Sequence, residues 1–191
     1  MDLIFASNNK HKLDEVKALA GVDFTIISLS EIGCCEEIPE DYPDLQGNAL
    51  QKARYIHNRY KKDCFADDTG LEIEALDMRP GVYSARYAGE NCSFEDNMNK
   101  VLQEMQDITN RKACFRTVIA LILDNKEYLF EGKVDGIILT EKHGDEGFGY
   151  DPIFQPEGFS KSFAQMDMDE KNSISHRGRA LEKLMDFLRK Q

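Results

Sequence analysis

Apolar and polar positions along the chain follow two different periods, and together they predict a mixed α/β protein. The apolar run Leu3–Ala6 is typical of a buried strand. From about Lys10 to Ala20, apolar residues recur every three or four positions, which predicts a helix. The polar turn Ser7–Asn9 separates the two. A strand, a tight polar loop and a helix N-terminus make a common anion-binding arrangement.

The rest of the pattern predicts further helices and strands. A second helix follows the proline-containing stretch 36–44, with Asn48 as its N-cap. Ser93 and Asp96 have the spacing of a capping box, so a third helix begins there. A fourth helix is expected near the C-terminus, over 180–188. Strands are expected over residues 24–29, 71–75, 114–123, 127–134, 136–139 and 153–154, with those after residue 113 forming an antiparallel meander.

The stretch Cys64–Leu71 ends an apolar run in two adjacent carboxylates, Asp67 and Asp68, followed by Thr69 and Gly70. A buried strand that leaves sharply at the glycine would hold both carboxylates at the rim of a sheet, where α/β proteins bind ligands. Hard oxygen ligands of this kind suit Mg²⁺. The same four residues are also good turn formers, so a plain turn is the alternative.

Composition and charge narrow the classes of ligand. The chain has 191 residues, 41% of them apolar, and a formal net charge of −11. Because it has no basic surplus, binding to nucleic acid is not expected, and a polyanion would need a local cationic pocket or a metal. No apolar run is long enough to span a membrane, and Met1–Ala6 does not resemble a signal peptide. Five cysteines without Cys-x-x-Cys spacing favour free thiols in a cytoplasmic protein.

The positions of the lysines are informative in so acidic a chain. Lys10 and Lys12 fall in the first turn of the first helix, where they oppose the helix dipole. An anion bound there would relieve that conflict. Lys52 lies one turn inside the second helix, within reach of a phosphate. Solvated lysines are the alternative in each case.

Two later segments carry groups suited to a flat ligand. The loop Gly144–Pro152 has three glycines around Phe148, so the ring could lie open against a base, although a plain surface loop fits equally well. Ser175, His176 and Arg177 precede the last helix and offer hydrogen bonds to a base edge or a phosphate. For His176, a structural histidine is the alternative. A Ser-His-Asp nucleophile is not expected, because adjacent side chains point apart and no nucleophile elbow is present.

Six blocks of the chain, taken together and in order, resemble the inosine/xanthosine triphosphate pyrophosphatases, also called the HAM1-like or non-canonical purine NTP pyrophosphatase family. The blocks are FASNNKHK at 5–12, NALQKA at 48–53, FADDTGL at 65–71, PGVYSAR at 80–86, GFGYDPIF at 147–154 and EKNSISHRG at 170–178. The resemblance implies a mixed α/β fold with two lobes and a central cleft over a long mixed sheet. It also implies one domain over residues 1–191, working as a homodimer.

The activity implied by the resemblance is Mg²⁺-dependent hydrolysis of ITP, dITP and XTP to the monophosphate and pyrophosphate, which cleanses the nucleotide pool. The family's pattern makes Asp68 the proton acceptor and assigns the metal to Glu40 and Asp68. Phe148 would stack on the purine, and donors such as His176 would face its 6-oxo group. The substrate-binding residues implied or indicated are Ser7, Asn8, Asn9, Lys10, His11, Lys12, Lys52, Thr69, Phe148, Gly149, Tyr150, Asp151, Lys171, His176 and Arg177.

The sequence departs from the family pattern in one region. Gly47 stands where the family commonly has Glu before the Asn-Ala pair, and Pro43 replaces a small or apolar residue. Because Glu37 and Asp41 lie close to Glu40, any of the three acids remains a candidate for the second metal ligand.

Three other functions remain open from sequence. The first is a Maf-like pyrophosphatase acting on modified nucleotides. The second is a nucleotide-binding protein without catalysis, and the third is a purely structural or interaction domain.

Overall fold

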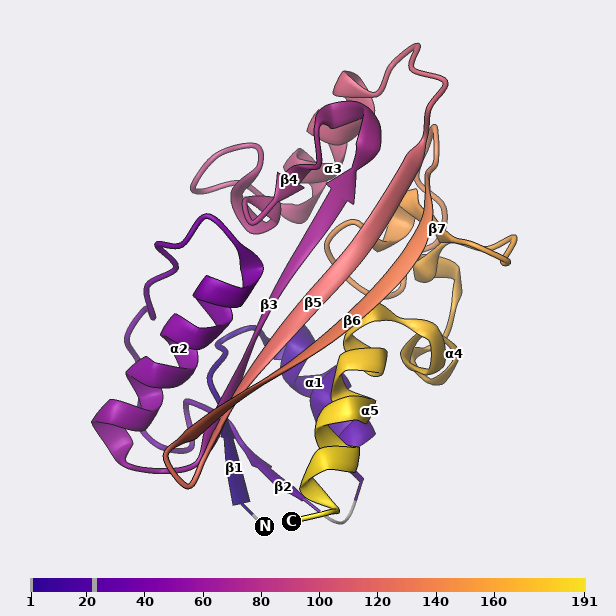
Figure 1. Cartoon of the computed structure of the whole chain (residues 1–191). Helices are drawn as coiled ribbons and strands as arrows, with labels where there is room; N and C mark the ends of the chain where they lie inside the picture. The colour runs from indigo at the N-terminus through magenta and orange to yellow at the C-terminus, as the bar shows by residue number, and fades with distance from the viewer. Residues whose placement is uncertain (1, 22–23) are drawn as a thin grey trace. The chain divides into compact units, whose positions relative to one another are not determined.

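The computed structural model describes residues 2–21 and 24–191, and its fold is mixed α/β, as predicted (Figure 1). The chain divides into two compact units. Unit 1 comprises residues 1–68, 117–132 and 177–191, and unit 2 comprises residues 69–116 and 133–176. Three strands contribute to both units: β3 (Cys64–Ile73), β5 (Lys112–Leu123) and β6 (Lys126–Ile138). That residues 1–191 act as one domain stays a prediction.

Unit 1 has a sheet with helices on both faces (Figure 1). Its elements are β1 (Asp2–Phe5), α1 (Lys10–Ala20), β2 (Thr25–Ile27), α2 (Leu45–Tyr60) and α5 (His176–Leu188), together with parts of the long strands. β1 runs parallel to both β2 and β3. Helices α1 and α5 share one apolar core with β1, β3 and β5. Helix α2 lies on the other face, where the Cys64 thiol donates to the Ala53 carbonyl at 3.2 Å.

Alternation along β3 divides its side chains between these two faces. Successive side chains of a strand point to opposite sides of the sheet. Phe65 belongs to the core beneath α1 and α5, so Asp67, two residues on, points to the same side. Cys64 faces α2, and Asp68, four residues later, points there too. The two adjacent carboxylates therefore have different surroundings.

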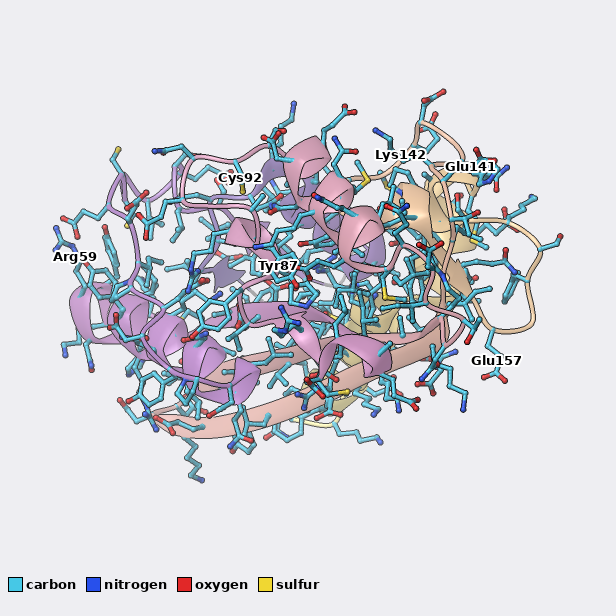
Figure 2. All side chains as sticks on the ribbon, turned by 90° about the horizontal axis from the view of Figure 1, so that it is seen from above. Arg59, Tyr87, Cys92, Glu141, Lys142 and Glu157 are labelled. Atoms are coloured by element: carbon cyan, nitrogen blue, oxygen red, sulfur yellow. The ribbon has the colours of Figure 1, made fainter. Side chains whose placement is uncertain are left out.

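Unit 2 is built from short elements around a second apolar core. Its elements are β4 (Arg79–Gly81), α3 (Phe94–Glu104), β7 (Phe154–Pro156) and α4 (Met168–Ile174), with 3-10 helices at Glu74–Leu76, Ser84–Arg86, Asp151–Ile153 and Phe163–Gln165. β4 pairs antiparallel with β3, and β7 with β6. Figure 2 shows Tyr87 among packed side chains, where the Lys100 ammonium lies 4.4 Å from the centre of its ring.

Two predicted strand boundaries, at Gly70 and at residue 135, prove to lie inside continuous strands, so those predictions were wrong. β3 continues through Gly70, so residues 64–73 form one strand and not a turn, and Asp67 and Asp68 lie within the strand and not at the rim of the sheet. A Cβ at Gly70 would lie 2.7 Å from the carbonyl oxygen of Gly81, so the glycine permits close pairing with β4. Gly136 likewise lies within β6, where a Cβ would meet the Gln155 carbonyl oxygen of β7.

The start of α2 also differs from the prediction. The helix begins at Leu45, and Asp44, not Asn48, caps it by accepting from the Gly47 N–H at 2.7 Å. Asn48 lies inside the helix and is fully buried. Helix α1 and the Ser93–Asp96 capping box are as predicted. Helix α5 covers the predicted residues but begins at His176, and α4 was not predicted. None of the helices in the described residues is both long and apolar enough to cross a membrane.

Candidate functional site

The Asp68 carboxylate lies at the end of a charged row on the α2 side of β3. Its Oδ1 accepts from the Lys52 ammonium at 3.1 Å and its Oδ2 from the Asn48 amide at 3.3 Å. Asn48 and Lys52 are one turn apart on α2, so they share a face of that helix. The same ammonium donates to Glu40 Oε1 at 2.5 Å. One cation therefore lies between two carboxylates.

Burial sets the protonation behaviour of this row. Asp68 is largely withdrawn from water, and this raises its pKa above the ordinary value even though Lys52 opposes the change. For Lys52, burial lowers the pKa, but the attraction of Asp68 and Glu40 outweighs burial and the net direction is upward. The lysine is thus held as a cation, whereas Asp68 takes up a proton more readily than an ordinary aspartate.

The loop before α2 distinguishes Glu40 from its acidic neighbour. Glu40 turns inward to Lys52, whereas Asp41 accepts from the Gln51 amide at 2.6 Å on an exposed part of the surface. The glycine at position 47 also has a local explanation. A Cβ there would lie 2.6 Å from the side chain of Tyr42, so Gly47 makes room for that ring.

The Asp67 carboxylate lies in a second, more deeply buried ionic cluster on the opposite side of β3. Its Oδ1 accepts from the Lys12 ammonium at 3.0 Å, and its Oδ2 accepts from Arg177 Nε at 3.1 Å. Arg177 also donates to Glu15. The Arg177 side chain is only 2% exposed, so its guanidinium lies within unit 1 between two carboxylates.

The charges of this second cluster stabilise one another. Burial alone would raise the pKa of Asp67, but Lys12 and Arg177 outweigh it and hold that pKa well below its usual range. Burial lowers the pKa of Lys12, and Asp67 opposes this. For Arg177, Glu15 and Asp67 outweigh burial and raise the pKa. Asp67 is therefore a permanent anion at neutral pH.

The N-terminus of α1 lies next to the second cluster. Asn9 caps the helix by accepting from the Lys12 N–H at 3.1 Å, and Ser7 Oγ accepts from the Asn9 N–H at 3.2 Å. Lys10 and His11 occupy the exposed first turn. No acidic residue lies in that turn, so the positive end of the helix dipole stays available to an anion.

Three site residues predicted in the later part of the sequence, Phe148, Asp151 and Lys171, contact one another within unit 2, whereas Arg177 lies in unit 1. Asp151 Oδ2 accepts from the Lys171 ammonium at 2.7 Å and from the Phe148 N–H at 2.8 Å. The same ammonium lies 4.9 Å from the centre of the Phe148 ring. Gly147 has a φ of 73°, and a Cβ there would collide with the Asp151 carboxylate, so this turn needs glycine.

Two predicted site residues of unit 2, Tyr150 and His176, are buried and contact other residues of that unit. The hydroxyl of Tyr150 donates to the Ser84 carbonyl at 2.7 Å, and burial raises the pKa of that hydroxyl. The His176 ring stacks on Phe115, with ring centres 4.6 Å apart and planes inclined by 12°. Thr69 and Gly149 are half-buried. The roles assigned to all of these residues stay predictions.

Among the charged and polar residues of unit 1, sequence reasoning missed Glu15, predicted a helix cap at Asn48 and grouped Asp67 with Asp68 as an oxygen ligand for Mg²⁺. Asn48 and Lys52 are spaced by one helical turn, and this spacing could have indicated that their side chains lie on the same face of the helix. Strand alternation could have separated Asp67 from Asp68 once residues 64–73 were recognised as one strand. Nothing in the local sequence points to Glu15, which meets Arg177 from 162 positions away.

The site contains two carboxylates that could bind a metal, Glu40 and Asp68, but no third ligand of this kind within the described residues. Among residues 2–21 and 24–191, no group of three or more His, Cys, Asp or Glu side chains is arranged to hold an ion. Glu40 and Asp68 nevertheless converge on one ammonium, so their oxygens are arranged around a single cation. A divalent ion held by two carboxylates, with substrate phosphates completing its shell, suits this donor set.

A mixed α/β fold in which the two adjacent carboxylates of β3 contact lysines near a helix N-terminus is typical of proteins that bind phosphorylated ligands. The chain belongs to the Ham1 family, whose profile matches residues 3–187. The chain is 53% identical over 189 residues to a dITP/XTP pyrophosphatase of Flavobacterium psychrophilum, with 99% of this chain and 100% of the relative covered.

Two further relatives extend the similarity. A dITP/XTP pyrophosphatase of Porphyromonas gingivalis is 55% identical over 187 residues, covering 97% of this chain and 96% of the relative. The structure of a HAM1 protein from Coxiella burnetii is similar with a TM-score of 0.91 and 36% sequence identity, with both chains fully covered. The expected family and fold are therefore confirmed.

Proposed function

We propose that this protein hydrolyses the non-canonical purine nucleotides dITP, ITP and XTP to the monophosphate and pyrophosphate, and so cleanses the nucleotide pool. Relatives that are more than half identical over nearly the whole chain are named dITP/XTP pyrophosphatases. The observation that carries the proposal is the row Glu40–Lys52–Asp68 in unit 1. It combines a cation for phosphate with carboxylates for a metal and for proton transfer.

Cutting between the α and β phosphorus atoms requires neutralisation of charge along three phosphates. Lys12, Lys52 and the N-terminus of α1 supply positive charge in unit 1. We expect the loop Ser7–Lys12 to hold the triphosphate. The exposed first turn of α1 and its lack of acidic residues support this role.

Mg²⁺ is the metal that we propose for the Glu40–Asp68 pair. Glu40 is favoured over Asp41 because its carboxylate shares Lys52 with Asp68, whereas Asp41 is bonded to Gln51. When bound, the ion supplies Lewis-acid charge to the phosphoryl oxygens. Lys52 would then be released from its two carboxylates and become available to a phosphate.

Asp68 is the proposed proton acceptor for the attacking water. A base works best when its pKa approaches the working pH, and burial moves the pKa of Asp68 in that direction. The Asn48 amide fixes one carboxylate oxygen, so the rotation of the acid is restrained. Asp68 would therefore present a defined oxygen to water.

Recognition of the purine is assigned to unit 2. Phe148 can stack on a base while Lys171 keeps its ammonium near the ring face. Within the described residues, the side-chain oxygen of Asn172 is buried and has no hydrogen-bond partner, so it can accept from a ligand N–H. A 6-oxo purine carries such an N–H at N1 and adenine does not. Thr69, His176 and Arg177 stay predicted contacts.

The test is a panel of nucleoside triphosphates with pyrophosphate and phosphate measured separately in Mg²⁺. We expect pyrophosphate release from dITP, ITP and XTP well above that from ATP. Preferred turnover of dUTP or a methylated pyrimidine triphosphate would favour a Maf-like activity instead. Saturable ITP binding without product would leave a nucleotide-binding protein, and no thermal shift with any purine triphosphate would favour a structural domain.

We also propose that the protein works as a homodimer in the cytoplasm, as the family resemblance implies. Sedimentation velocity at several concentrations tests the dimer, and cell fractionation tests the location. A species of 21.8 kDa at all concentrations would contradict the dimer.

A further inference from the structure

Asp67 has no role in the proposed chemistry, but its buried carboxylate lies between two residues that do, Lys12 and Arg177. Asp67 is 1% exposed and joins Lys12, expected at the phosphates, to Arg177, expected at the base. Both of its oxygens are used, Oδ1 by Lys12 and Oδ2 by Arg177. Since each oxygen is fixed by a different cation, the carboxylate has one defined orientation.

Arg177 is fixed in turn by Glu15, which makes an alternating series of charges, Glu15–Arg177–Asp67–Lys12. The series links α1, β3 and α5 within unit 1. Three of its members are nearly inaccessible to water, whereas the Lys12 side chain at its end is 15% exposed. Lys12 is therefore the most accessible member of the series.

A lysine ammonium has three N–H donors on a flexible four-carbon stem. Asp67 takes one donor of Lys12 at 3.0 Å and leaves two for a ligand. We propose that Asp67 is a positioning residue, which holds the Lys12 ammonium at the start of α1 so that its remaining donors meet the substrate's phosphate groups. This inference rests on the proposed function for the identity of the substrate, but the phosphate-binding step can be tested alone.

The charges around Lys12 predict a second measurable effect of Asp67, on the pH dependence of phosphate binding. Burial, Lys52 and Arg177 all lower the pKa of Lys12, while Asp67 and Asp68 raise it. Removal of Asp67 therefore leaves a half-buried lysine near two cations, with only Asp68 still raising its pKa. Lys12 would then lose its proton at a lower pH, and phosphate binding would weaken as the pH rises.

The first experiment measures binding of inorganic tripolyphosphate by calorimetry in metal-free buffer. Asp67→Asn should raise Kd about tenfold, the effect expected for one misplaced charged hydrogen bond. Asp14→Asn, which removes an exposed aspartate from the same helix, is the matched control and should stay within about twofold. Equal Kd values for the two variants would overturn the proposal.

A double-mutant cycle shows whether the effect passes through the lysine. In a Lys12→Met background, Asp67→Asn should change Kd for tripolyphosphate little further, because the group that it positions is gone. An undiminished effect in that background would mean that Asp67 acts by another route. The basic limb of the pH profile of kcat/KM should also move to lower pH in Asp67→Asn, and an unmoved limb would count against the proposal.

Asp67→Glu covers the case in which the asparagine variant does not fold. Glutamate keeps the charge but displaces the carboxylate by one methylene, so KM and the tripolyphosphate Kd should rise while kcat and the basic limb stay near wild type. Unchanged KM and Kd would overturn the proposal. If wild type binds tripolyphosphate but hydrolyses neither dITP nor XTP, the proposed function fails while these binding tests still decide the role of Asp67.

Discussion

Replacement of Arg177 by methionine tests how much a buried ionic cluster contributes to this fold. Methionine retains much of the apolar stem but removes the guanidinium, so Glu15 and Asp67 both lose a cation inside unit 1. Side-chain exposures of 6% for Glu15 and 1% for Asp67 mean that water cannot take its place. Removing one partner of a buried ion pair costs about 3–5 kcal/mol.

The matched control is Arg54→Met, which breaks a pair of the same chemistry at the surface. Arg54 donates through Nε and Nη2 to both oxygens of Glu127, each at 2.7 Å, but its side chain is 46% exposed. Exposed pairs contribute about 0–1 kcal/mol. For a chain of this size, 1 kcal/mol changes Tm by about 2–4 °C, so Arg177→Met should lower Tm by about 6–20 °C and Arg54→Met by less than about 4 °C.

Thermal melts followed by circular dichroism at pH 7, supported by urea titrations, measure both variants under the same conditions. The pH dependence gives a further check. The pKa of Asp67 is depressed in the folded protein, so its contribution is complete above the ordinary value of 3.8 and is lost as the pH falls further. The gap between Arg177→Met and wild type should therefore narrow in acid. Similar Tm losses for Arg177→Met and Arg54→Met would refute the reasoning from burial.

Three further predictions concern the site and the thiols. Asp68→Asn should lower kcat for pyrophosphate release from dITP by about 100-fold or more while nucleotide binding stays measurable by calorimetry. Phe148→Leu should raise KM for dITP about threefold to tenfold, with tripolyphosphate binding unchanged. Burial raises the pKa of Cys64 and Cys114 to about 12, so both should resist an aromatic disulfide reagent at pH 8 until urea unfolds the protein, whereas exposed Cys35 should react first.

Local sequence predicted the elements whose signals are local. The helix Lys10–Ala20 and the capping box at Ser93 follow from periodicity and hydrogen-bonding side chains within one turn. The predicted strand boundaries beside Gly70 and Gly136 were wrong because the role of these glycines depends on distant backbone. At each glycine, the lack of a Cβ lets the carbonyl of a neighbouring strand approach closely, and the nearby sequence does not indicate which strand will be the neighbour.

The candidate site likewise has a part that the local sequence predicts and a part that depends on distant segments. The motif around Asp68 is continuous and could be recognised, but its partners Glu40 and Lys52 come from a loop and a helix that only the tertiary fold brings to it. Arg177 was predicted to bind a base edge or a phosphate, and its deep burial between Glu15 and Asp67 could not be inferred from residues 175–178. Ion pairs between distant segments leave little trace in a single sequence.

The alternation of side chains in β3 has a consequence for mutation. Asp67 and Asp68 are chemically identical, and only their order along the strand decides which one meets Lys12 and which one meets Lys52. Deleting or inserting a single residue between Cys64 and Asp67 would exchange their sides of the sheet. Such a change keeps every acid and base of the motif, yet it would offer each cation the wrong carboxylate.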